Sequence, residues 1–289
     1  MRKEVRQAVP SISVSFSVTT ALVKRRENAY TVFNFEMGDE RVDEKQRAAY
    51  ETLITDVQAS YAEEQNGLVW CGDCQEINLW TYWQGRNADK VKILLVGQDW
   101  GSICTEETQK WVKKLCIVPE DGFFPYMEEN KSLTDKNLVE LFRTIGYNVD
   151  KNEEKNRELF FTNFVLGYRK DKKISGGYRG SWGKHDGVFF ARLVNILDPE
   201  YMFCLGRNTF EGALTALNQP RPKIHRYNDF LQSEQNPVSV HLDDGRETKI
   251  CALAHCGGMG TANRNRDGRN HADPLEQQKQ DWKWVQRKG

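Results

Sequence analysis

The chain has 289 residues, of which 39% are hydrophobic and 28% charged, which is enough apolar material for one large core. Its 41 basic and 41 acidic side chains cancel, so nucleic-acid binding would need local basic groups. No run of about 18 apolar residues occurs, which excludes a membrane-spanning helix, and the apolar stretch 12–23 has no clean secretory cleavage site. We therefore expect a cytoplasmic protein without a membrane partner, whose seven scattered cysteines are reduced.

The first part of the chain predicts a helix and a strand after an irregular start. Residues 1–41 mix Ser, Thr and charged side chains without a period, so we assign them to an N-terminal appendage and 42–289 to one domain. Apolar spacing predicts a helix from Val42 to Tyr61. The branched apolar run Val91 to Val96 predicts a buried parallel strand that stops at Gly97. A second helix is predicted from Thr134 to Ile145.

The rest of the chain alternates short apolar runs with amphipathic segments. Three further strands are predicted at Leu159–Asn163, Tyr201–Leu205 and Lys249–Ala254. Three further helices are predicted at Gly187–Leu197, Arg207–Leu217 and Pro274–Gln286. Strands that alternate with helices are typical of a parallel sheet covered on both faces. The expected fold is α/β, a three-layer α/β/α sandwich with a central, mainly parallel four-stranded sheet.

Three of the predicted strands end in polar residues of different chemistry. Asp99 follows the first strand, Asn163 ends the second and His255 follows the last. The carboxyl ends of parallel strands lie on one edge of a sheet, so a carboxylate, an amide and an imidazole are expected in one cleft. Singly, Asp99 can cap a helix, Asn163 can bond its own turn and His255 can be structural. Their equivalent positions favour a common site.

Four segments, in chain order, resemble the uracil-DNA glycosylase superfamily. VKILLVGQDWGS is similar to that family's water-activating motif, whose core reads GQDPYH. LFFTNFVLGYR resembles the segment with the base-reading Asn, and YMFCLGRNTFEGAL the following strand, Gly and helix. ALAHCGGMGTANRN is similar to the HPS-type loop with the catalytic imidazole. The implied fold is therefore uracil-DNA glycosylase-like.

The resemblance implies an enzyme that flips a nucleotide out of DNA and hydrolyses its N-glycosidic bond. It places Asp99 and His255 as catalytic residues and Gln98 and Asn163 as substrate-binding residues. The segment DGFFPYM resembles the one that stacks on the base, and it assigns this role to Phe124, with Phe123 as the alternative. Both can also be core aromatics in a loop. No metal or organic cofactor is required, and we expect a monomer.

Two departures from the family pattern bear on specificity. Trp100 and Gly101 replace the Pro and Tyr of the family loop, and that Tyr blocks the thymine methyl group, so the choice of base stays open. Cys256 follows His255 where the family has Pro, and the next residues are rich in Gly and then Arg, so no residue is assigned as the wedge that enters the duplex.

A cysteine pair resembles part of a metal site in another branch of the family. Cys71 and Cys74 resemble the first two iron-sulfur ligands of the thermophile-type enzymes. Gly167 and His185 stand near the third and fourth ligand positions, so the set of four thiolates is incomplete. A zinc site with Cys71, Cys74 and His185 is the alternative, but a single CxxC is weak support. We expect no metal.

The sequence thus favours a DNA glycosylase that removes uracil or a related deaminated base. One alternative is a non-catalytic member of the same fold that binds nucleic acid or a nucleobase, and another is a hydrolase of free nucleosides or nucleotides. Local basic groups can provide DNA contacts, although each can equally be an ordinary solvated loop. They are Arg169, Lys170, Lys172 and Lys173; Arg221, Lys223 and Arg226; and Arg264, Arg266 and Arg269.

Overall fold

The computed structural model describes residues 44–70, 77, 91–101, 132–151, 153–170, 177–242, 245–267 and 271–288. They belong to one compact unit, Arg41–Gly289. The appendage predicted for residues 1–41 lies outside the described residues. Within the described ranges, no helix is both long and apolar enough to cross a membrane.

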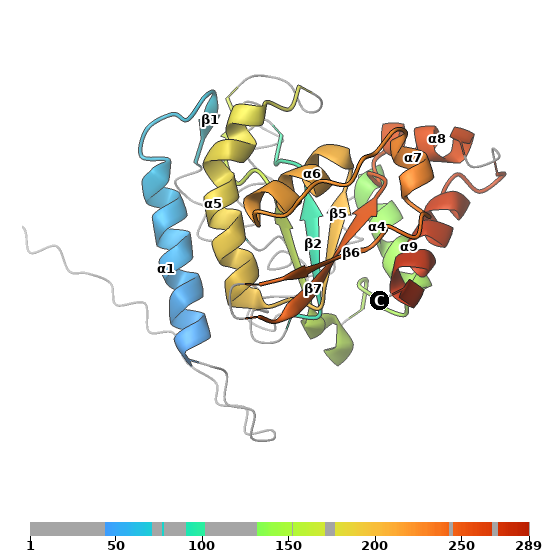
Figure 1. Ribbon diagram of the computed structural model, residues 1–289, viewed down its shortest axis with the longest axis horizontal. Helices are drawn as coiled ribbons and strands as arrows, with labels where there is room; N and C mark the ends of the chain where they lie inside the picture. The colour runs from blue at the N-terminus through green and yellow to red at the C-terminus, as the bar shows by residue number, and fades with distance from the viewer. Residues whose placement is uncertain are drawn as a thin grey trace, which may run out of the picture. The chain divides into compact units, whose positions relative to one another are not determined.

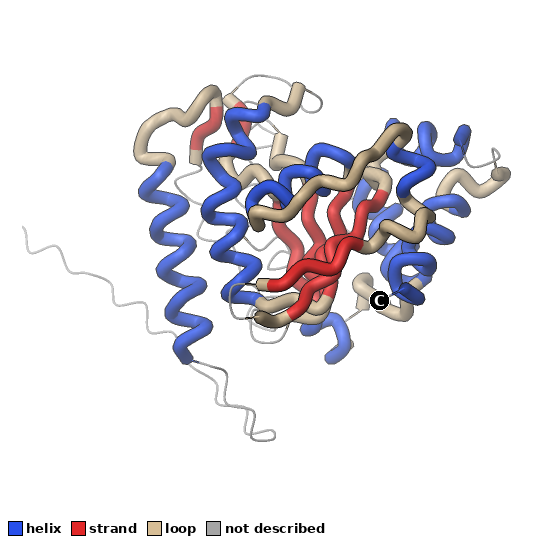
Figure 2. Tube along the Cα trace, in the orientation of Figure 1, coloured by secondary structure: helices blue, strands red, loops and turns tan. Residues whose placement is uncertain are grey.

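A mixed sheet of five strands, in the order β3-β2-β5-β7-β6, forms the centre of the fold (Figures 1 and 2). Neighbours among the first four strands are parallel: β3 (Leu159–Asn163), β2 (Ile93–Gly97), β5 (Tyr201–Leu205) and β7 (Glu247–Leu253). The fifth, β6 (Val238–His241), pairs antiparallel with β7. The α/β class and the mainly parallel sheet are confirmed, but the prediction of four strands is wrong.

Helices cover both faces of the sheet, because successive side chains of a buried strand point to opposite faces. Leu94 and Val96 of β2 pack with α1 (Glu44–Ser60), α5 (Gly180–Leu197) and α6 (Arg207–Ala216). Ile93 and Leu95 of the same strand pack with α4 (Leu133–Thr144) and α9 (Glu276–Lys288). Figure 1 shows α1 and α5 beside each other on the first of these faces. This explains why the parallel strands are continuous apolar runs rather than alternating ones.

The smaller elements lie around the sheet. A two-stranded antiparallel sheet joins β1 (Leu68–Val69) to β4 (Tyr168–Arg169). The other short elements are the 3-10 helix η2 (Glu154–Glu158), α7 (Tyr227–Phe230) and α8 (Gly258–Asp267).

Most of the predicted elements form, although one helix begins earlier than its sequence pattern indicates. β3 and β5 have the predicted bounds, and the predicted helices correspond to α1, α4, α5, α6 and α9 with shifted ends. α5 begins at Gly180 instead of Gly187. Its first turns contain glycine, which disfavours helix, but the buried Trp182 and Asp186 anchor them by tertiary packing.

Candidate functional site

The candidate site lies at the carboxyl edge of the sheet, between the ends of β2 and β5. The chain passes from β2 to its neighbour β3 on one side, and from β5 to β7 on the other. α4, which lies between β2 and β3 in sequence, packs on one face of the sheet, whereas α6 follows β5 and packs on the other. Connections that leave adjacent strands toward opposite faces open a crevice at the strand ends. Ligand binding is therefore expected there.

Asp99 lies just beyond β2, and three hydrogen bonds fix its carboxylate. The backbone N–H of Gly101 donates to Oδ1 (2.9 Å), while the Gln98 amide (2.9 Å) and the Arg169 guanidinium (2.7 Å) donate to Oδ2. The side chains of Arg169 and Asp99 are 1% and 5% exposed, so they form a buried salt bridge. The Arg169 guanidinium also lies over the Trp182 ring, 5.0 Å from its centroid. Asp99 is thus held beside a buried cation.

The predicted basic groups divide into buried and exposed residues. The surface assignment is wrong for Arg169, which pairs with Asp99, and for Arg264, whose Nε and Nη2 each donate to Asp281 at 2.6 Å. Both guanidiniums are therefore structural. The exposed members are Lys170, Arg221, Lys223, Arg226 and Arg266, and the members outside the described residues are Lys172, Lys173 and Arg269.

Asn163 ends β3 directly beside Gly97, its partner in the parallel register. The residue is 6% exposed, and within the described part of the chain its side-chain amide has no hydrogen-bond partner. The amide lies over the Gly97 backbone, because a Cβ atom on Gly97 would be 2.2 Å from Asn163 Oδ1. Gly97 therefore provides the space for a buried amide whose donors and acceptor are available to a ligand.

His255 lies in the loop after β7 at the sheet edge, where the residue as a whole keeps contact with solvent while surrounding protein atoms displace part of the water around its ring. The backbone N–H of Gly257 donates to its Nδ1 (2.9 Å), so the neutral ring carries its proton on Nε2. Loss of hydration lowers the pKa of His255 below its usual 6.5, and the negative charge of Asp99 only partly opposes this effect. At neutral pH the ring is thus a neutral donor through Nε2–H.

Buried side chains from three helices hold the backbone of the His255 loop. The Gln278 amide of α9 donates to the His255 carbonyl (3.1 Å), and the Asn137 amide of α4 donates to the Cys256 carbonyl (2.7 Å). The Thr261 hydroxyl of α8 donates to the Gln278 side-chain oxygen (2.9 Å). We call Asn137, Thr261 and Gln278 the loop clasp. The sequence analysis missed it, although polar residues on the buried faces of amphipathic helices are a recognisable signal.

Gln98 connects Asp99 to a residue that the sequence analysis also missed. Its amide nitrogen donates to Asp99, and its amide oxygen accepts a hydrogen bond from the Asn208 side chain (3.2 Å). Asn208 lies in the first turn of α6, which begins just after β5. Both ends of the Gln98 side-chain amide are therefore engaged, and they connect the loop after β2 to the first turn of α6.

Two exposed apolar side chains lie beside the His255 loop. Met259 is 78% exposed, and Leu133, at the start of α4, is 55% exposed. Leu133 packs on the loop, since a Cβ atom on Gly258 would be 3.2 Å from its Cδ2. Exposed apolar side chains next to a polar crevice are suited to contact with an apolar ligand surface such as stacked bases.

Trp100 is half-buried and stacks on Tyr168, with ring centroids 5.0 Å apart and planes inclined by 31°. Its ring therefore belongs partly to the packing of the loop after β2. The predicted stacking residue Phe124, its alternative Phe123, and the cysteines Cys71 and Cys74 all lie outside the described residues.

His185 takes part in a buried network at the first helical turns of α5. Its Nδ1 is 2.6 Å from an oxygen of Asp186, which also accepts a hydrogen bond from the Tyr61 hydroxyl (2.7 Å). Among the described residues, no group of three or more His, Cys, Asp or Glu side chains is placed to hold a metal ion. The position of the His185 ring is thus explained by its contact with Asp186, which Tyr61 shares.

Comparison with protein-family models finds no match, and comparison with curated proteins finds none either.

Proposed function

We propose that this protein is a DNA glycosylase that hydrolyses the N-glycosidic bond of uracil or a related deaminated base. The observations that carry the proposal lie at the carboxyl edge of the sheet: a carboxylate on Asp99 held by hydrogen bonds, an amide on Asn163 beside Gly97, and an imidazole on His255 close enough to interact electrostatically with Asp99. The ordered resemblance of the four segments to uracil-DNA glycosylases supports the same reaction. Its cofactor-free chemistry needs only these side chains and water.

Each group has a defined part in the proposed reaction. The Asn163 amide provides both donor and acceptor to the polar edge of a flipped base. As the glycosidic bond breaks, negative charge grows on the base and positive charge on the sugar. The Nε2–H of His255 stabilises the departing base, because a donor aimed at a developing anion lowers the barrier. Asp99 stabilises the sugar cation and orients the attacking water.

The hydrogen bonds of Asp99 indicate which of its oxygens would act. A carboxylate accepts roughly four hydrogen bonds, and Oδ2 already receives two, from Gln98 and Arg169. Oδ1 receives one, from the Gly101 backbone, and so keeps capacity for a water molecule. In the proposed mechanism Oδ1 faces the reacting centre, while the salt bridge with Arg169 holds the carboxylate in place.

The same contacts support a second candidate, a non-catalytic protein that binds nucleic acid or a nucleobase. Arg169 partly neutralises Asp99, and its salt bridge also explains the acid as a structural element of the loop. Such a protein would use the Asn163 amide for recognition without base release.

A cleavage assay distinguishes these functions. Oligonucleotides with uracil, hypoxanthine or xanthine, single- and double-stranded, are incubated with wild type and with Asp99→Asn, Asn163→Ala and His255→Ala. Glu51→Gln serves as a control on the exposed surface of α1. We expect base release by wild type and the control, and losses of about 100-fold or more in the site variants. Equal behaviour of wild type, Asp99→Asn and His255→Ala on every substrate would refute the proposal.

The pH dependence gives a second readout. Because the pKa of His255 is lowered, the ring is neutral at pH 7, and the rate should fall as the pH drops through that pKa. Protonation also removes the Nδ1 lone pair that accepts the Gly257 N–H. A rate that rises as His255 becomes protonated would contradict the assigned donor.

A further inference from the structure

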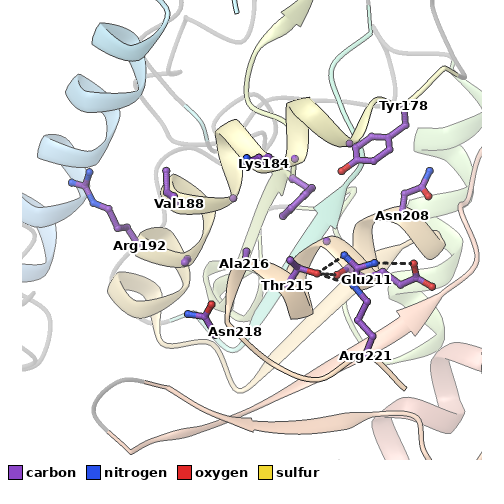
Figure 3. A pocket seen from close by; sticks show the side chains of 16 residues that line it. Tyr178, Lys184, Val188, Arg192, Asn208, Glu211, Thr215, Ala216, Asn218 and Arg221 are labelled. Atoms are coloured by element: carbon purple, nitrogen blue, oxygen red, sulfur yellow. Dashed lines mark hydrogen bonds and ion pairs between the residues drawn. The ribbon is translucent and has the colours of Figure 1, made fainter. Parts of the chain in front are cut away.

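A groove lies between α5 and α6, with a volume of about 980 Å³ (Figure 3). Phe164 forms part of it, and small residues of both helices, including Gly183 and Gly212, let the helices approach the Phe164 ring closely. Its lining on α5 extends from Gly180 to Arg192, a span of about 18 Å at the helical rise. The groove is therefore an elongated channel along the two helices.

The charges along the groove have an excess of positive sign. Its lining includes the cations of Lys184, Arg192 and Arg221 and the carboxylate of Glu211. Arg192 pairs with Asp56 at 2.7 Å outside the groove. Arg221 and the nearby Arg207 share Glu211, at 3.7 and 2.6 Å. Lys184 has no salt-bridge partner within the described ranges. The lining itself thus has three cations and one carboxylate, in a chain with no net charge.

One end of the groove meets the crevice at the strand ends. Asn208 lines the groove and donates its side-chain hydrogen bond to Gln98, which in turn bonds Asp99. Tyr178 lines the same end and places an aromatic ring there (Figure 3). The end of the groove at Asn208 is therefore connected by hydrogen bonds to the loop that contains Asp99.

We propose that this groove binds the phosphodiester backbone of the DNA strand that flanks the nucleotide held in the crevice. The inference rests on the proposed function, and it assigns Lys184 and Arg221 as phosphate contacts. A groove with excess positive charge and an aromatic side chain is the usual way in which proteins follow a single strand without reading its sequence. At the axial rise of about 3.4 Å per phosphate that one strand has in duplex DNA, a span of about 18 Å corresponds to at most about five phosphates, and to fewer for an extended single strand. An acidic peptide shares the negative charge but not the continuity with a nucleotide site.

The test is the binding of a fluorescent oligodeoxythymidylate, which contains no uracil, to the full chain at several salt concentrations. Lys184→Gln and Arg221→Gln are compared with Lys283→Gln on α9 and Arg157→Gln in η2, which are exposed cations outside the groove. We expect each groove variant to weaken binding several-fold and to reduce the slope of log K against log salt by about 0.7, and the controls to leave both unchanged.

The outcomes separate this inference from the proposed function. Groove variants that behave like the controls overturn the inference, even if uracil is cleaved. A polyglutamate peptide that binds as tightly as the oligonucleotide and loses affinity in the same variants also overturns it, in favour of an acidic protein partner. Groove-dependent oligonucleotide binding without cleavage of any deaminated base supports the inference and refutes only the glycosylase reaction.

Discussion

The Gly97→Ala substitution should displace the Asn163 amide with little effect on the rest of the fold. The new Cβ atom would lie 2.2 Å from Asn163 Oδ1, whereas ordinary contact begins near 3.4 Å, so the oxygen must move by about 1.2 Å. The amide has no hydrogen bond to lose among the described residues, so the cost is mainly a strained rotamer, about 0.5–1.5 kcal/mol. A misplacement of about 1 Å in a positioning group can lower a rate by about 100-fold. We therefore expect kcat/KM for base release to fall by about 100-fold while the protein stays folded.

A double-mutant cycle tests whether the Asn163 amide lies over Gly97, and its stability readout does not depend on the proposed reaction. In the Asn163→Ala background the clash disappears, and the nearest remaining neighbour is the Phe161 ring at 3.6 Å. Gly97→Ala should then change neither the urea-unfolding free energy nor the residual rate. Gly180→Ala is the matched control, because a Cβ there meets nothing within 4 Å. If Gly97→Ala has the same effect in both backgrounds, the amide does not lie over Gly97 and the argument fails.

Three further predictions concern the groups around the crevice. Arg169→Met leaves Asp99 buried without its counter-charge, so the unfolding free energy in urea should fall by about 3–5 kcal/mol, and adding Asp99→Asn should restore much of it; no restoration would contradict the pairing. Gln278→Met removes a donor to the His255 carbonyl and should cost about 1–3 kcal/mol in the same assay. It should also shift the ¹⁵N resonances of the His255 ring, and unchanged resonances would show that the loop clasp does not position this ring. Burial raises the pKa of Asp135 from 3.8 to about 8, so the folded protein retains a proton that the unfolded chain releases. Stability should therefore fall as the pH rises from about 4 to 8, and Asp135→Asn should flatten this dependence; parallel curves would refute the raised pKa.

The central strands could be predicted because their local pattern and their burial agree. β5 is an apolar run in the interior of the sheet, and β3 is largely buried although it is an edge strand. β3 ends in Asn163 and β5 is followed by Gly206, and these residues mark where the chain leaves the sheet. β6 has only one buried side chain, Val240, and an edge strand of this kind gives no continuous apolar signal. α8 begins in a glycine-rich segment and is held by tertiary contacts of Thr261 and Arg264. Local propensity underestimates both elements.

The positions of the candidate site residues could be predicted, but their partners could not. Asp99 and Asn163 are fixed by where strands end, which the apolar runs indicate. Arg169 comes from a two-residue strand, and its basic neighbours in sequence made it resemble a surface residue. Gln278 reaches the His255 loop from a helix near the other end of the chain. Such pairings depend on how distant elements pack, which no local pattern encodes.

The two ionisable groups of the proposed site lie in opposite electrostatic environments at the same strand edge. Asp99 is held beside the buried Arg169 guanidinium, whereas loss of hydration keeps His255 neutral. Breaking a neutral N-glycosidic bond creates a cation on the sugar and an anion on the base. A positive imidazolium would stabilise the base but repel the sugar cation, while a neutral Nε2–H stabilises the base without that repulsion. A negative charge on Asp99 beside a neutral donor on His255 therefore suits this bond cleavage better than two charged groups would. This arrangement depends on Arg169 and Gly257 as much as on the residues that touch the substrate.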